Sequence, residues 1–271
     1  MCEDYECADL FADSDFVEKT GINAETFAKR APLVEYDPET KVAHFYPTKT
    51  KGFLINHPLK NIFFSFSGKS FSNFIESVKF YRNPKISDLI ETVKKYTFHD
   101  TFYCTKVNLL LAGDAEDLKE EAKYIKQLQN AIFTLAKKCP VTIKATFRGM
   151  HISEKEFKAY PLKELIYIPS FLSTSKNEEK FYRSTNNCLI EIKLNNVPNN
   201  AIAITEELSI YAEEEEEVLF GCYSKFRIQE KQQNFNYKGS NFEYFIRLEH
   251  INEPSVNLDQ GTILMLNFLG F

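Results

Sequence analysis

The chain has 271 residues, a formal net charge of −5 at pH 7 and 44% apolar residues. With 25 Phe and 14 Tyr it has ample material for the packed core of one or two globular domains. The negative charge argues against a nucleic-acid binder that works by bulk phosphate neutralisation. No apolar run approaches the roughly 20 residues that cross a bilayer.

The six cysteines and five histidines show no metal-ligand spacing. Since neither a CxxC nor an HExxH motif is present, we expect no metal site, and we expect the cysteines to be reduced thiols. The N-terminal 15 residues are acidic, whereas a secretion signal is basic and then apolar. We therefore expect a cytoplasmic protein, or one delivered as an effector without a cleavable signal.

Residues 1–85 carry no recognisable chemistry, and we expect them to be an N-terminal extension or accessory region of unknown role. Within them, Val34 to Pro47 predicts a hairpin with its turn at Asp37-Pro38-Glu39-Thr40.

From Ile86 to Cys139 the apolar spacing predicts helices. After Pro140 the period changes to that of strands. This order of helices and then strands predicts an α+β fold with a mostly antiparallel sheet. The predicted strands are Val141–Met150, Leu165–Ile168, Cys188–Leu194, Val218–Phe220, Lys225–Ile228 and Tyr244–His250.

The first segment that could carry chemistry is Phe147-Arg148-Gly149, at a strand end. A guanidinium there can clamp a phosphate because it is planar, permanently charged and bidentate. Gly149 leaves the backbone accessible to a ligand. An arginine on the polar face of a strand is, however, more often simply solvated.

The second segment is Phe171-Leu172-Ser173-Thr174-Ser175. Three consecutive hydroxyls at the start of a segment are typical of a helix cap or turn. The residues that follow, Lys176 to Glu179, are similar to a first helical turn. Alternatively, the hydroxyls position a neighbouring carboxylate and a sugar hydroxyl.

The third segment is Glu213 to Glu217, which runs directly into the apolar Val218 to Phe220. Such a run is normally a solvated loop. If the chain becomes extended here, Glu215 and Glu217 share one face and direct two carboxylates into one cleft. Crowded carboxylates beside an apolar strand form a plausible catalytic pair.

Together, the three segments closely resemble the R-S-E class of mono-ADP-ribosyltransferases, with 25 residues from Arg148 to Ser173 and 44 from Ser173 to Glu217. This class includes arginine-modifying bacterial toxins and animal ecto-enzymes. The resemblance covers about Ile86 to Ile251, and Lys94 to Leu111 is similar to the family's tyrosine- and asparagine-bearing helix. It implies a catalytic domain over 86–271, with helices packed on a split sheet and NAD as co-substrate.

The resemblance also implies roles for individual residues. Arg148 would grip the NAD pyrophosphate and ribose, and Ser173 would hold Glu217 and the nicotinamide-side ribose. Glu217 would be the catalytic carboxylate, and Glu215 would handle the acceptor. The remaining cofactor-binding or supporting positions that it implies are Gly149, Thr174, Ser175, Phe181, Arg183, Tyr103 and Asn108.

The implied activity is transfer of ADP-ribose from NAD to a protein acceptor with release of nicotinamide. Glu215 favours arginine as acceptor, because family members that modify other residues often have Gln at this place. Two alternatives remain: an NAD glycohydrolase with water as acceptor, and an inactive interaction module of the same fold. We expect a monomer whose partners are NAD and a protein substrate, with no nucleic acid.

Overall fold

The computed structural model describes residues 34–37, 42–45, 85–98, 103–113, 118–178, 180 and 186–252. In this part of the chain, no helix combines the length and apolarity that a bilayer crossing requires. Strands β1 (Val34–Asp37) and β2 (Val42–Phe45) pair antiparallel, which confirms the predicted hairpin. The residues between these strands lie outside the described part, and the domain boundary at residue 85 stays a prediction.

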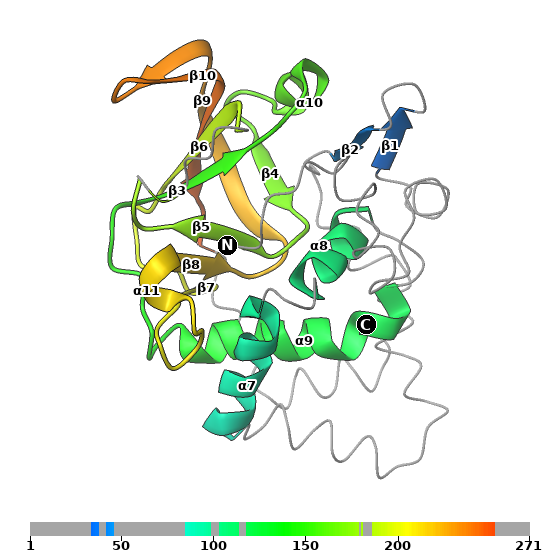
Figure 1. The fold of residues 1–271 in the computed structure, drawn as a ribbon, viewed down its shortest axis with the longest axis vertical. Helices are drawn as coiled ribbons and strands as arrows, with labels where there is room; N and C mark the ends of the chain where they lie inside the picture. Colours follow the sequence, from blue (N-terminus) through cyan, green and yellow to red (C-terminus); the bar gives the residue numbers. More distant parts are fainter. Residues whose placement is uncertain are drawn as a thin grey trace.

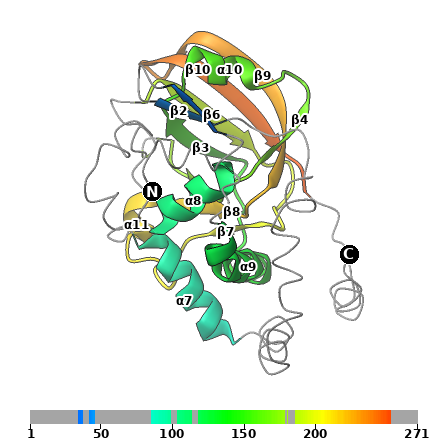
Figure 2. The ribbon, with the colours of Figure 1, turned by 90° about the vertical axis from the view of Figure 1, so that its right-hand side faces the viewer.

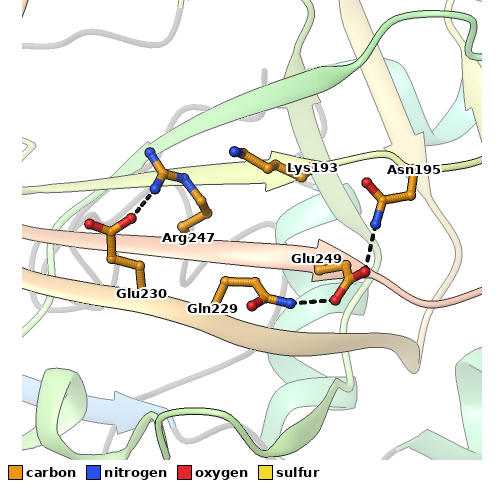
Figure 3. Close-up of a pocket in the computed structure, with 6 residues that line it drawn as sticks. All are labelled: Lys193, Asn195, Gln229, Glu230, Arg247 and Glu249. Carbon is orange, nitrogen blue, oxygen red and sulfur yellow. Dashed lines mark hydrogen bonds and ion pairs between the residues drawn. The ribbon is translucent and has the colours of Figure 1, made fainter.

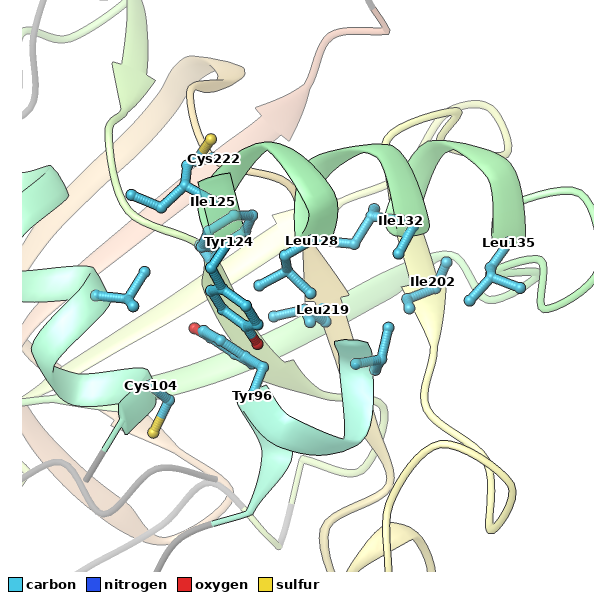
Figure 4. Packing of buried hydrophobic residues seen from close by; sticks show 14 of the residues in the cluster. Tyr96, Cys104, Tyr124, Ile125, Leu128, Ile132, Leu135, Ile202, Leu219 and Cys222 are labelled. Atoms are coloured by element: carbon cyan, nitrogen blue, oxygen red, sulfur yellow. The ribbon is translucent and has the colours of Figure 1, made fainter. Parts of the chain in front are cut away.

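Between residues 85 and 140, three described helices precede the main sheet, as the apolar spacing predicted. They are α7 (Ile86–Thr97), α8 (Tyr103–Gly113) and α9 (Leu118–Leu135). Side chains of α9 such as Leu128 point onto Leu219 and Ile202 of the sheet, and the helices share one apolar core with these strands (Figure 4). Figure 2 shows the helices gathered on the side of the sheet where β7 (Ala201–Ala203) and β8 (Glu217–Phe220) lie.

The main sheet has eight strands in the order β4-β9-β10-β6-β3-β5-β8-β7 (Figure 1). All neighbouring strands pair antiparallel except β10 and β6, which are parallel. The predicted α+β class with a mostly antiparallel sheet is therefore confirmed. The strands are β3 (Ala145–Met150), β4 (Leu165–Ile168), β5 (Leu172–Ser175), β6 (Cys188–Lys193), β7 (Ala201–Ala203), β8 (Glu217–Phe220), β9 (Ser224–Tyr237) and β10 (Ser240–His250).

The sheet is split between β3 and β5. These strands are joined at one residue pair, Phe147 with Ser175, whereas β3 and β6 pair over six residues. The split separates a five-stranded part, β4-β9-β10-β6-β3, from a three-stranded part, β5-β8-β7. Apolar side chains of both parts, including Phe220 and Phe226, form a second core.

Two short helices complete the described part. Helix α10 (Glu154–Ala159) begins with a capping box in which the Ser153 hydroxyl accepts from the Glu156 N–H and the Glu156 carboxylate accepts from the Ser153 N–H. Helix α11 (Ala212–Glu215) precedes β8. The sequence pattern predicted neither helix, because both are too short to show a helical period.

Three local predictions are wrong. Strand β3 begins at Ala145 instead of Val141, because its pairing with β6 begins with Ala145 opposite Lys193. Strand β9 continues to Tyr237, because its polar second half is held by backbone pairing with β10 instead of by an apolar face. Residues 176–178 form bends and a turn, not the first turn of a helix.

The cysteines also differ in part from expectation. Cys139, Cys188 and Cys222 are free thiols, as predicted. Cys104 is disulfide-bonded, so the prediction of six reduced thiols is wrong for this residue. In the described residues no group of His, Cys, Asp and Glu is arranged to hold a metal ion.

Candidate active site

The predicted arginine crosses the split in the sheet. Arg148 projects from β3 and its Nη1 donates a hydrogen bond of 2.7 Å to the backbone carbonyl of Ser173 on β5. The side chain is half-buried. A guanidinium has five donors in a rigid fork, so it can hold this carbonyl and also bind a phosphate oxygen.

Ser173 and Glu217 lie on the same face of the three-stranded part. Ser173 pairs with Leu219, and Ser175 pairs with Glu217. Because side chains alternate along a strand, Ser173, Ser175 and Glu217 share the face of Leu219, which packs against the helices. Ser173 and Glu217 are therefore diagonal neighbours, about 7–8 Å apart for such positions.

Two polar side chains at this place are buried, and the described residues offer neither of them a hydrogen-bond or ion-pair partner. Ser173 is 5% exposed and Glu217 is 3% exposed. Within the described residues, the Ser173 hydroxyl has no hydrogen-bond partner. The Glu217 carboxylate also takes part in none of the hydrogen bonds or ion pairs found there. Since buried polar groups are normally hydrogen-bonded, this pair indicates a site for a polar ligand.

Glu215 does not lie on an extended strand, so the prediction that Glu215 and Glu217 share a strand face is wrong. Glu215 is the last residue of α11, and Glu216 follows with a left-handed φ of 47°. Hydrogen bonds to the end of β5 hold it there: the Glu215 and Glu216 carbonyls accept from the Ser175 hydroxyl and the Lys176 N–H, each at 2.9 Å. The Glu215 side chain is half-buried at the end of this helical turn.

The glutamate run is fixed by a lysine. Lys180 Nζ lies 3.0 Å from the Glu216 carboxylate and donates to the Glu213 carbonyl at 2.6 Å. The hydrogen bond from Lys180, followed by one from Asn177, lowers the pKa of Glu216 below its usual value. The run is therefore attached to the turn after β5 at several points, which a freely solvated loop would not be.

The other predicted residues of β3 and β5 support the strands. The Thr174 hydroxyl is buried and donates to the Val218 carbonyl at 3.0 Å, so it joins β5 to β8. Ser175 accepts from the Asn177 N–H at 3.0 Å in addition to its bond to Glu215. Gly149 is buried and pairs with Leu189 of β6.

Of the predicted residues outside these strands, Asn108 reaches the site and Tyr103 does not. Asn108 Oδ1 accepts from the backbone N–H of Phe171, two residues before Ser173. The Tyr103 hydroxyl instead donates to Glu121 on α9. The two remaining predictions, Phe181 and Arg183, lie outside the described residues.

Two residues at the site have no signal in the sequence pattern. Tyr96 occupies an apolar position of α7, so periodicity assigns it to the core, yet its hydroxyl accepts a hydrogen bond from Asn108. Gln129 of α9 accepts from the Cys222 N–H at 3.0 Å and so holds the turn after β8. Both contacts join segments that are remote in sequence.

The depression between Lys193, Asn195, Gln229, Glu230, Arg247 and Glu249 contains none of the predicted residues (Figure 3). Its arginine and its two carboxylates already have partners. Arg247 pairs with Glu230 and with Glu191, and Glu249 accepts from Gln229 and Asn195. We therefore place the candidate active site at the split of the sheet.

The sequence matches no model of a known protein family and no curated protein. Solved structures with similar folds exist. ADP-ribosyltransferase HopU1 of Pseudomonas syringae pv. Tomato DC3000 has 18% identity and a TM-score of 0.49, over 84% of this chain and 96% of that chain. The type III effector XopAI from Xanthomonas axonopodis pv. citri has 13% identity and a TM-score of 0.49, over 73% of this chain and 79% of that chain.

A third similar structure is C3stau2 from S. aureus with NAD. It has 12% identity and a TM-score of 0.48, over 67% of this chain and 92% of that chain. At such low identity, a functional proposal has to depend on the residues of this chain.

Proposed function

We propose that this chain is a mono-ADP-ribosyltransferase that uses NAD as co-substrate and transfers ADP-ribose to an arginine of another protein. Two observations support the proposal: Arg148 bonds the Ser173 carbonyl across the split of the sheet, and Ser173 and Glu217 share one face of the neighbouring strands β5 and β8. These are the three residues that the sequence resemblance selected. The buried Ser173 hydroxyl, which has no hydrogen-bond partner among the described residues, and the buried Glu217 carboxylate beside it support a ligand rich in hydroxyl groups, such as a ribose.

Glu217 is the proposed catalytic residue. When the bond between ribose and nicotinamide breaks, its electron pair leaves with nicotinamide and positive charge develops on the ribose carbon, as in glycoside hydrolysis. A carboxylate held in a buried site stabilises that charge as it forms. The Ser173 hydroxyl can donate to this carboxylate or to the ribose, and Arg148 can bind the pyrophosphate, which aligns the reacting carbon.

Glu215 is the proposed acceptor residue. An arginine side chain is protonated at pH 7, so it becomes a nucleophile only if it loses a proton. Glu215 would orient the acceptor and take that proton while a guanidinium nitrogen forms the new bond to the ribose carbon. The contact between the Glu215 carbonyl and Ser175 supports this role, because it places α11 next to the strand of Ser173.

The direct test is to incubate the protein with NAD and a cell lysate and to map modified side chains by mass spectrometry. We expect nicotinamide release and a mass increase on arginine. Free ADP-ribose without modified protein would favour the glycohydrolase. A protein whose thermal stability does not rise with NAD would be the inactive interaction module, since a ligand bound only by the native state must stabilise it.

A further inference from the structure

A tyrosine and an asparagine from two different helices form a buried pair next to the candidate active site. Tyr96 belongs to the last turn of α7 and is 3% exposed. Asn108 of α8 donates from Nδ2 to the Tyr96 hydroxyl at 2.8 Å. Its Oδ1 accepts from the Phe171 N–H at 3.1 Å. One amide therefore connects both helices to the segment that enters β5.

This connection fixes the backbone that leads to Ser173. Phe171 is fully buried, so its N–H would be costly to leave without an acceptor. The ring of Phe171 also packs edge-to-face on Tyr96, with centroids 5.5 Å apart. Ser173 follows two residues later, and its carbonyl is the acceptor for Arg148. A displacement of Phe171 would thus move the groups that bind the ligand.

Asn108 donates its hydrogen bond to the oxygen of the Tyr96 hydroxyl. The O–H proton of Tyr96 is not used in this bond, so the hydroxyl can donate it to another acceptor. Burial raises the pKa of Tyr96 well above its usual range, the Glu217 carboxylate raises it further, and Arg148 opposes this effect. The hydroxyl therefore stays protonated at working pH and lies within electrostatic reach of both charged site residues.

We propose, on the premise of the function above, that Tyr96 and Asn108 are positioning residues for the reaction. Asn108 holds the Phe171–Ser173 segment and orients the Tyr96 hydroxyl. Tyr96 packs its ring on Phe171, and its hydroxyl dipole is held in place by Asn108. A dipole fixed in this way favours one orientation of the buried Glu217 carboxylate, which makes no hydrogen bond or ion pair among the described residues.

The kinetic test compares Tyr96→Phe with Tyr124→Phe. Tyr124 is a matched control, because it is a buried tyrosine of the same core whose hydroxyl donates to the Thr92 carbonyl instead. We expect Tyr96→Phe to lower kcat for nicotinamide release about tenfold with little change in the KM for NAD. Tyr124→Phe should keep kcat within about twofold while lowering Tm by a similar or larger amount.

The second test needs no activity. In protein with ¹³Cζ-labelled tyrosine, the Tyr96 resonance, assigned by its loss in Tyr96→Phe, should shift in Glu217→Gln and stay in place in Glu216→Gln. Asn108→Asp should also shift it, because the new carboxylate keeps the acceptor for Phe171 but draws the Tyr96 proton toward itself.

The outcomes separate this proposal from the proposed function. A Tyr96 resonance that ignores Glu217→Gln would overturn the positioning role, and so would equal kcat losses in the two tyrosine variants. If Glu217→Gln shifts the resonance but the wild-type protein neither transfers nor hydrolyses NAD, the proposed function is overturned and the electrostatic coupling between Tyr96 and Glu217 still holds.

Discussion

Phe147 of β3 and Ser175 of β5 form the single pair that joins the two parts of the described sheet. The residues next to this pair on both strands are those of the candidate site. Arg148 follows Phe147, and Ser173 precedes Ser175 by two positions. Because the strands separate beyond this pair, the Arg148 guanidinium can reach the Ser173 carbonyl, a group that a continuous ladder would use for backbone pairing.

Glu217→Gln is expected to abolish nicotinamide release, with a loss of about 10²–10³ in kcat, because the amide carries no charge to stabilise the ribose cation. The fold should persist, since Gln has nearly the same shape. Release of nicotinamide can be followed by chromatography. Glu216→Gln is the control, as its carboxylate faces Lys180. Turnover near the wild-type rate in Glu217→Gln would refute the catalytic assignment.

Glu215→Gln should lose transfer to protein and keep NAD hydrolysis. The amide cannot take the proton of the acceptor arginine, whereas water as acceptor does not need this group. Protein-bound and free ADP-ribose can be measured in the same reaction with labelled NAD. An equal reduction of both products would contradict this separation of roles.

Arg148→Lys should raise the KM for NAD by roughly tenfold or more. An ammonium is a point charge and cannot hold the Ser173 carbonyl and a phosphate in the planar geometry of a guanidinium. Arg227→Lys is the matched control, because Arg227 lies on β9 and pairs with Glu249. NAD titration by calorimetry checks both variants, and unchanged affinity in Arg148→Lys would exclude Arg148 from the binding site.

The stability of the protein should fall between about pH 6.5 and pH 4 because of His250. Burial lowers the pKa of His250 to about 4, and its Nε2 lies 2.9 Å from Asn200 Oδ1. In the unfolded chain His250 binds a proton near pH 6.5, whereas in the folded chain it binds one only near pH 4. Acid therefore favours the unfolded chain in this window. The loss approaches about 3 kcal/mol below pH 4.

Urea unfolding at several pH values measures this loss. His250→Gln should flatten the pH dependence over the same window, since Gln does not titrate. If the free energy of unfolding depends on pH equally in wild type and variant, the dependence comes from carboxylates and not from His250.

Gly221→Ala should destabilise the turn after β8 by about 1–3 kcal/mol. A Cβ at this position would lie 2.7 Å from Gln129 Oε1, so the amide that accepts from the Cys222 N–H would have to move. In a Gln129→Ala background the same substitution should cost much less, because the obstacle is gone. Thermal melts of wild type, both single variants and the double variant test this prediction. If the two losses of stability simply add in the double variant, the proposed clash between Gly221→Ala and Gln129 is wrong.

Much of the architecture was predictable from local pattern. The apolar period of the helices up to Leu135 and the strand alternation in segments such as Cys188–Lys193 depend on neighbours a few residues away, and both are confirmed. The limits of β9 and the helical turn at Ala212–Glu215 were not predictable. The polar second half of β9 is held by backbone pairing with β10, which an apolar pattern does not report. The helical turn is held in part by Ser175 and Lys176, which are distant in sequence.

The sequence by itself selected the candidate residues, because the types and spacing of Arg148, Ser173 and Glu217 are properties of the chain alone. Only the tertiary structure decided that Arg148 bonds the Ser173 carbonyl, that Glu215 leaves the strand face of Glu217, and that Tyr96 and Asn108 stand beside them. The physical reason is that burial and hydrogen bonding are settled by which strands and helices meet, and an apolar pattern cannot distinguish an ordinary core tyrosine from one whose hydroxyl is bonded by an asparagine of another helix.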